Sequence, residues 1–110
     1  ILVSHHHSIM EYSVPPLMAL PKIRKAVGDS MKIFVDCCIE TGMDAFKALA
    51  LGADAVGVGQ HLIPYLRDEG AEGVARRMGE MNGELQTVMN RTGFRTLDEI
   101  DDSVIWMRNF

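Results

Sequence analysis

Three clusters of chemically active side chains each follow an apolar run in the chain. The clusters are His5-His6-His7 after Ile1 to Ser4, Asp36-Cys37-Cys38 after Ile33 to Val35, and Gly59-Gln60-His61 after Ala55 to Val58. An imidazole titrates near neutral pH and can accept a proton there, and a carboxylate can accept hydrogen bonds from hydroxyl groups. If the apolar runs are parallel strands, their carboxyl ends form one rim, where such sheets bind ligands. We therefore predict a site at this rim.

The histidine triplet also permits a metal site. Residues two apart on a strand point to the same side, so His5 and His7 could hold one metal ion. Glu11, Asp36 or a cysteine would complete the coordination shell. A run of three histidines lacks the paired spacing of a known metal fingerprint, so we assign no metal ligand from the sequence.

The segment from Lys32 to Gly59 has the pattern of a strand, helix, strand unit. Its two apolar runs are continuous rather than alternating, as in parallel strands that are covered on both faces. Between them, apolar residues recur at helical spacing, with Gly42 and Asp44 at the expected start and Gly52 at the expected end. A crossover of about 30 residues between parallel strands is right-handed in nearly all proteins.

The residues before this unit predict a first strand and two helical turns. Ile1 to Ser4 is the strand. Pro15-Pro16 opens one turn, and Pro21 begins a second turn that ends at Gly28, because proline is tolerated at the first position of a helix but not in its interior.

The residues after the third strand predict helices. We expect a short helix from His61 to Arg67, a long one from Ala71 to Arg91, and a short last helix that begins with a capping box at Thr96 to Glu99. The long helix has an apolar stripe, which consists of Val74, Met78, Met81, Leu85 and Val88. Its charged residues lie largely off the stripe; they are Arg76, Arg77, Glu80, Glu84 and Arg91.

Composition narrows the class of protein. The 110 residues make one domain at most, and 47% hydrophobic with 24% charged residues is ordinary for a soluble globular chain. The net charge of −4 argues against nucleic-acid and anionic-membrane partners, which would favour a basic patch. No apolar run approaches the roughly 20 residues of a membrane helix. The only two cysteines are adjacent, so we expect no disulfide framework and a reducing, cytoplasmic setting.

Residues 35–60, VDCCIETGMDAFKALALGADAVGVGQ, resemble the last βαβ segment of the FMN-dependent 2-hydroxy-acid oxidoreductases, the family of glycolate oxidase, lactate oxidase and flavocytochrome lactate dehydrogenase. That segment has an Asp-Gly-Gly, a Gly-x-Asp-x-x-Lys-Ala-Leu-x-Leu-Gly-Ala helix and a final Gly-Arg. Upstream, ILVSHHHSIMEYSVPP resembles the family's Val-Ser-Asn-His-Gly-Gly-Arg stretch.

The resemblance implies an α/β fold, namely the carboxyl-terminal three βα units of a TIM (β/α)8 barrel plus terminal helices. Residues 1–110 would be a partial FMN-dependent dehydrogenase domain with barrel strands six to eight, because a complete barrel takes about 250 residues. The chain begins at Ile1 in what has the pattern of a strand interior, so we expect it to be part of a longer protein.

The resemblance also implies site residues and a cofactor, FMN. His6 falls on the family's catalytic histidine, Asp36 on an aspartate near the flavin ribityl chain, and Gly59 on a glycine at the FMN phosphate. The other residues expected at the cofactor are Cys37, Cys38, Gly57 and Gln60.

Five positions depart from the family pattern. Ile9, Glu40 and Gln60 stand where the family has arginines that hold the substrate carboxylate or lie near the cofactor, and Cys37-Cys38 replaces Gly-Gly. The implied function is FMN-dependent oxidation of a small 2-hydroxy acid or related substrate within a complete barrel. Loss of the arginine clamps leaves an alternative open, a non-catalytic phosphate-ligand or assembly module.

We also expect a homo-oligomer. Three strands taken from an eight-stranded barrel leave two unpaired edges and an uncovered inner face, and both favour association with a second chain.

Overall fold

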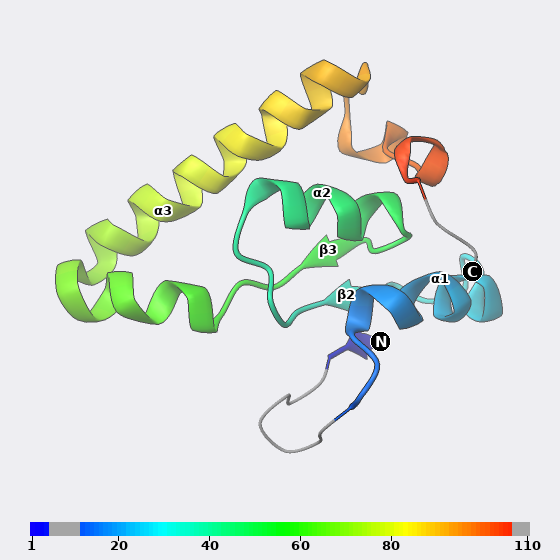
Figure 1. The fold of residues 1–110 in the computed structure, drawn as a ribbon, viewed down its shortest axis with the longest axis horizontal. Coiled ribbons are helices and arrows are strands. Elements are labelled where there is room, and N and C mark those ends of the chain that lie inside the picture. The colour runs from blue at the N-terminus through cyan, green and yellow to red at the C-terminus, as the bar shows by residue number, and fades with distance from the viewer. Residues whose placement is uncertain (5–11, 107–110) are drawn as a thin grey trace.

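A computed structural model of the protein describes residues 1–4 and 12–106. Strands and helices alternate, as β1 (Leu2–Val3), α1 (Pro16–Val27), β2 (Phe34–Val35), α2 (Gly42–Ala50) and β3 (Ala55–Val56). A 3-10 turn η1 (Gln60–Leu62), the long helix α3 (Ile63–Thr92) and two further 3-10 turns, η2 (Leu97–Glu99) and η3 (Asp102–Val104), complete the chain (Figure 1). The predicted order of three βα units is therefore confirmed. The predicted base His6, the rival metal ligands His5, His7 and Glu11, and Ile9 lie outside the described residues.

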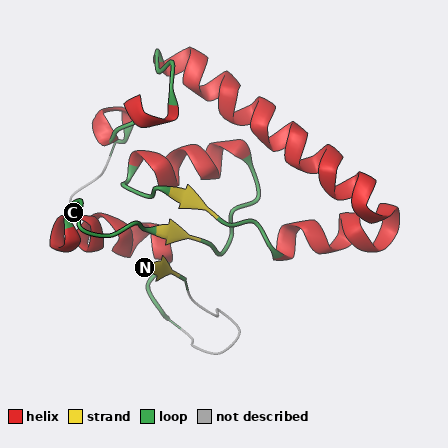
Figure 2. Ribbon diagram, turned by 180° about the vertical axis from the view of Figure 1, so that it is seen from behind, coloured by secondary structure: helices red, strands yellow, loops and turns green. Residues whose placement is uncertain are grey.

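The three strands form a parallel sheet in sequential order, β1-β2-β3, and lie side by side (Figure 2). Leu2 is level with Phe34, which is level with Ala55. Because side chains alternate along a strand, the next residues, Val3, Val35 and Val56, point to the opposite face.

The two faces of the sheet differ in burial. Val3 and Val35 belong to the main core, where Leu20 of α1 and Ala45 and Ala48 of α2 are also buried. On the other face, Leu2 is 61% and Phe34 52% exposed. This is the uncovered inner face that the sequence analysis predicted.

Helix α1 corrects the prediction of two turns separated by Pro21. The structure has one helix with Pro21 in its interior and an end at Gly28, where φ is +56°. An interior proline removes a backbone hydrogen bond and costs about 3 kcal/mol. The helix nevertheless continues through it, because Leu20 is fully buried and Leu17, Ile23 and Val27 pack on the same core.

Helix α2 lies between the sheet and α3 (Figure 1). It begins with a reciprocal capping box, in which the Thr41 side chain accepts a hydrogen bond from the Asp44 N–H and Asp44 caps the Thr41 N–H. A Cβ on Gly42 would clash with the backbone of Met81 and Leu85 in α3. Gly42 is therefore a contact point between two helices, in addition to marking the start of α2.

Helix α3 turns sharply at Gly70, whose φ of 67° and ψ of −155° are not helical. This break separates the predicted short helix from the predicted long one, and both predictions are confirmed. Met81 of the predicted apolar stripe is buried, and Leu85 and Val88 pack on a second core around Phe46 and Ile100. Arg77, which the sequence analysis placed with the charged residues largely off the stripe, is nevertheless buried, with 9% exposure.

The residues after α3 return over the end of α2 (Figure 1). The ring of Phe94 lies 6.1 Å from that of Phe46 and closes the second core. The predicted helix at Thr96 is the short turn η2, but Thr96 makes no capping hydrogen bond. Instead, Glu99 Oε2 accepts the Arg95 N–H over 3.0 Å. Neither hydrogen bond of the predicted capping box forms, so that prediction was wrong.

Within the described ranges, no helix is long and apolar enough to cross a membrane.

Candidate functional site

The carboxyl ends of the three strands form the predicted rim. The Asp36 N–H donates to the Val3 carbonyl over 3.3 Å, and the Gly57 N–H donates to the Val35 carbonyl over 2.7 Å. These ladder bonds bring Asp36 next to the end of β1 and Gly57 next to the end of β2.

The Cys37 thiol connects two of the strand ends. Its Sγ donates to Asp36 Oδ1 over 3.3 Å and lies 3.2 Å from the Ser4 hydroxyl oxygen. The thiol therefore holds the Asp36 carboxylate in place. Because Asp36 is only half-buried, a ligand at the rim can still contact it. A carboxylate in this place can accept hydrogen bonds from the hydroxyl groups of a ligand.

Gly57 faces Asp36 directly. A Cβ on Gly57 would lie 3.3 Å from the Asp36 Cβ, which is closer than nearly all real contacts of that kind. The absence of a side chain at Gly57 therefore leaves the space that the Asp36 side chain occupies. The structure brings these two predicted site residues together.

Cys37 and Cys38 have φ angles of 73° and 59°. Such left-handed backbone favours glycine, because a Cβ crowds the neighbouring carbonyl. In the sequence analysis these cysteines replace the Gly-Gly pair of the family, and the left-handed backbone explains why glycine suits those positions. Cys38 is exposed and Cys37 half-buried.

The turn after β3 begins at Gly59, the residue before η1. A Cβ on Gly59 would meet nothing within 4 Å among the described residues, so packing within them does not require a glycine. Gln60 is exposed and opens η1. Between described residues, no hydrogen bond joins Gln60 to Asp36.

Sequence reasoning missed Arg77, which is the centre of a buried polar network. Its Nε donates to His61 Nε2 over 2.9 Å, and its Nη2 donates to the Glu40 carbonyl over 2.7 Å. Its Nη1 donates to Glu80 over 3.1 Å and to Glu84 over 2.8 Å. The guanidinium therefore touches both the loop after β2 and the turn after β3.

Glu84 extends this network to α2. Its second carboxylate oxygen accepts the Gly42 N–H over 2.7 Å. That hydrogen bond, together with the Arg77 guanidinium, lowers the pKa of Glu84, while the hydrogen bond from Arg77 to Glu84 raises the pKa of Arg77. The spacing of positions 77, 80 and 84 places all three on one helix face, which is the signal that could have revealed the network.

Glu40 is one of the residues that the sequence analysis expected in place of a family arginine. Its N–H donates to Asp44 Oδ2 over 3.1 Å, and its carbonyl accepts from Arg77. Both backbone groups of Glu40 are thus engaged, and they fix the loop between β2 and α2.

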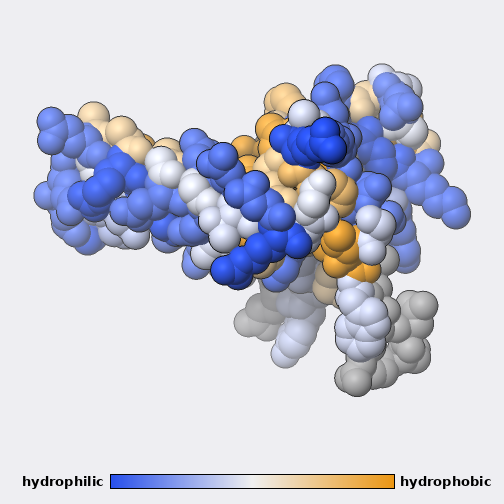
Figure 3. All heavy atoms as spheres, turned by 90° about the horizontal axis from the view of Figure 1, so that it is seen from above, coloured by the Kyte–Doolittle hydropathy of each residue, from blue (hydrophilic) through white to orange (hydrophobic). Residues whose placement is uncertain are grey.

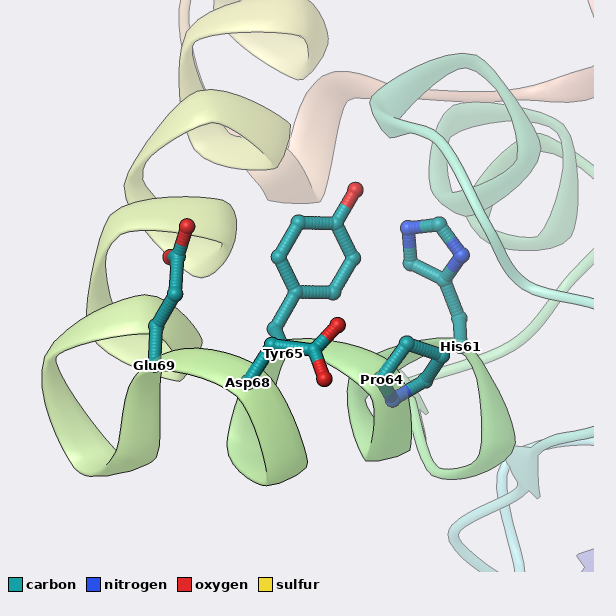
Figure 4. A pocket seen from close by; sticks show the side chains of 5 residues that line it. All are labelled: His61, Pro64, Tyr65, Asp68 and Glu69. Atoms are coloured by element: carbon teal, nitrogen blue, oxygen red, sulfur yellow. The ribbon is translucent and has the colours of Figure 1, made fainter.

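A pocket of about 400 Å³ opens beside the first half of α3 (Figure 4). His61 and Tyr65 line it, with ring centroids 5.5 Å apart, and Pro64, Asp68 and Glu69 complete its wall. Of the residues predicted at the rim, His61 alone is among those that line this pocket. Around the kink of α3, at the left of Figure 3, the surface is mainly hydrophilic.

Within residues 1–4 and 12–106, no group of three or more histidine, cysteine or acidic side chains is arranged to hold a metal ion.

Comparison with known proteins identifies similar chains. The model of a family described as FMN-dependent dehydrogenase matches residues 1–107. The chain is 36% identical to a 2-hydroxyacid oxidase of Dictyostelium discoideum over 99% of its own length and 28% of that protein. It is 37% identical to the glycolate oxidase of Spinacia oleracea, over 96% of this chain and 29% of the relative. The chain therefore spans less than a third of these relatives.

Solved structures of the same family have the same fold as this chain. Mandelate oxidase, in a structure with (S)-2-phenylpropionate, superposes with a TM-score of 0.86 at 30% identity, over 92% of this chain and 30% of that one. Other structures of mandelate oxidase, including variants of it, have the same TM-score, and this enzyme is a TIM-barrel flavoenzyme. The predicted family resemblance and the predicted fold class are thereby confirmed.

Proposed function

Because this chain belongs to the FMN-dependent dehydrogenase family, we propose that within a complete barrel it forms one wall of a site for FMN-dependent oxidation of a small 2-hydroxy acid. The observation that carries the proposal is the rim, where Asp36, Gly57 and the turn at Gly59 follow neighbouring parallel strands. Ligands of such barrels bind at this end of the strands.

The described residues fit the chemistry of FMN. The Asp36 carboxylate is an acceptor for the hydroxyl groups of the ribityl chain. Gly59 leaves open space at the start of η1, where backbone N–H groups can approach a phosphate. When bound, FMN takes up the electrons removed from the substrate. The role of the protein is to hold and orient the two molecules.

We assign the base by the sequence resemblance alone. His6 would accept the hydroxyl proton of the substrate on an imidazole nitrogen. Ile9 stands where the family has an arginine that holds the substrate carboxylate. An alkyl side chain cannot form that bidentate contact, so simple lactate and glycolate should be poor substrates, and Ile9→Arg should improve their turnover.

We propose that the chain associates with further copies of itself. Leu2 and Phe34 expose apolar surface on the inner face of a sheet whose edge strands are β1 and β3. A reducing, cytoplasmic location remains our proposal on the basis of the adjacent cysteines.

The test of the reaction uses a complete barrel that contains this chain, loaded with FMN and kept free of oxygen. Addition of a panel of 2-hydroxy acids should bleach the flavin absorbance with at least one of them. His6→Gln should keep the flavin but slow bleaching by about 100-fold or more, the usual contribution of a general base. An FMN-loaded protein that no 2-hydroxy acid reduces would contradict the proposed reaction.

A further inference from the structure

We propose that Arg77 is a positioning residue for the cofactor phosphate, because it fixes the turn after β3 to the loop after β2. This inference rests on the proposed function. Arg77 does not itself serve as the phosphate cation. It holds the backbone amides at Gly59 and Gln60 in the place where a phosphate would meet them.

The geometry of Arg77 supports its role as a clamp, meaning a side chain that holds the turn after β3 to the loop after β2. All three guanidinium nitrogens donate hydrogen bonds, to His61 on one side, to the Glu40 carbonyl on the second and to two carboxylates on the third. Arg77 itself is only 9% exposed, although the side chains of its partners Glu80 and Glu84 are 50% and 38% exposed. Since Glu80 and Glu84 neutralise its charge, little remains to attract a distant anion.

The hydrogen bond to His61 connects Arg77 to the turn after β3, where the phosphate is proposed to bind. An arginine Nε can only donate, so His61 Nε2 must accept, and its ring proton is then on Nδ1. His61 is the second residue of η1, directly after Gln60. Fixing its ring therefore restrains the two residues whose amides precede it.

The need for such a clamp follows from two replaced arginines. With Glu40 and Gln60 in their places, a phosphate at this rim depends more on backbone N–H groups. Such groups bind an anion well only if they are held in position beforehand. Among the described residues, Arg77 is the arginine that joins the two loops concerned.

Arg24 provides a natural comparison at the other end of the same strand pair. Its guanidinium donates to the Gly52 carbonyl over 2.8 Å and to Asp54 over 2.5 Å. Asp54 in turn accepts the Ile33 N–H over 2.9 Å. Arg24 thus clamps the amino ends of β2 and β3, the end of a barrel that serves stability rather than ligand binding.

The experiment measures the affinity of a complete barrel containing this chain for FMN and for riboflavin, which lacks the phosphate, by flavin fluorescence quenching. Arg77→Met should weaken FMN binding by about 10-fold or more, as expected from the loss of charged hydrogen bonds, and should change riboflavin binding far less. Arg76→Met, on the exposed neighbour, and Arg24→Met should leave the ratio of the two affinities unchanged.

A second variant distinguishes loss of the clamp from misfolding of the barrel. His61→Ala removes the partner on the turn and keeps the Arg77 ion pairs, so it should reproduce the selective loss of FMN affinity in a folded protein. Hydrogen exchange of the flavin-free barrel should show faster exchange of the amides at 59–62 in both variants.

Equal loss of FMN and riboflavin affinity, or unchanged exchange at 59–62, would overturn the inference and leave Arg77 a structural role only. If the unaltered barrel binds neither flavin, the proposed function fails and the phosphate role fails with it. Hydrogen exchange would still decide whether Arg77 clamps the turn.

Discussion

The Asp36 Cβ lies 3.3 Å from the position that a Cβ on Gly57 would occupy, so these two residues meet across the carboxyl ends of β2 and β3. Gly57→Ala should therefore push the Asp36 side chain aside by a few tenths of an ångström. Because Asp36 is proposed to contact the ribityl chain and not the phosphate, FMN and riboflavin should lose affinity to the same degree. Titration of both flavins checks this. A loss confined to FMN would contradict the assignment of Asp36.

The left-handed backbone at Cys38 predicts a stabilising substitution. Cys38→Gly should raise the free energy of unfolding by about 1 kcal/mol, because it removes a Cβ from a conformation with a φ of 59°. Cys38→Ala is the matched control, since it removes the thiol but keeps the Cβ, and it should give no gain. Urea unfolding followed by circular dichroism measures both. Equal stability of the two variants would show that the backbone there is unstrained.

Glu84 predicts how stability depends on pH. Its pKa in the folded protein is lowered from the ordinary 4.5 by the Gly42 N–H and the Arg77 guanidinium. A lowered carboxyl pKa stabilises the fold above the unfolded value, and this contribution disappears as the pH falls through the folded value. Glu84→Gln should lower the free energy of unfolding by about 1 kcal/mol at neutral pH, a figure reduced for its partial exposure.

The difference in unfolding free energy between the unaltered protein and Glu84→Gln should vanish at pH values well below 4.5, where Glu84 is protonated in the folded and the unfolded state. Unfolding measured across that range checks the sign. A constant difference at every pH would mean that the carboxylate charge contributes nothing.

The exposed inner face of the sheet predicts association of the isolated chain. Phe34 is 52% exposed there, beside Leu2. Phe34→Ser should shift the chain toward the monomer, because it removes apolar surface from the centre of the face. Met18→Ser is a suitable control on α1, where Met18 is 70% exposed. Light scattering on size-exclusion peaks measures the molar mass of each protein. If the unsubstituted chain is already a monomer, the proposal of association is refuted.

The parallel strands, and the separation of a short helix from a long one after them, could be predicted from the sequence, because continuous apolar runs and helical periodicity are strong local signals. Helix α1 could not, since its continuation through Pro21 depends on the burial of Leu20 in a distant core. Local propensity yields to tertiary packing at such a position.

The same contrast applies to the site. Strand topology predicted that Asp36 lies at the rim, whereas Gly57 was expected at the cofactor only from the family resemblance. Arg77 was overlooked because an arginine on a helix is usually solvated, and its burial depends on partners at Glu40 and His61 that are far away in sequence. Contacts of that kind appear only once the helices are packed.

The central claim is that this rim binds FMN, and equilibrium titration of FMN into a complete barrel containing this chain tests it most directly. We predict quenching of flavin fluorescence with a stoichiometry of one FMN per barrel and affinity that falls about 10-fold in Asp36→Ala, which loses the hydroxyl acceptor. The absence of quenching by the folded barrel, or quenching that Asp36→Ala leaves unchanged, would contradict the account.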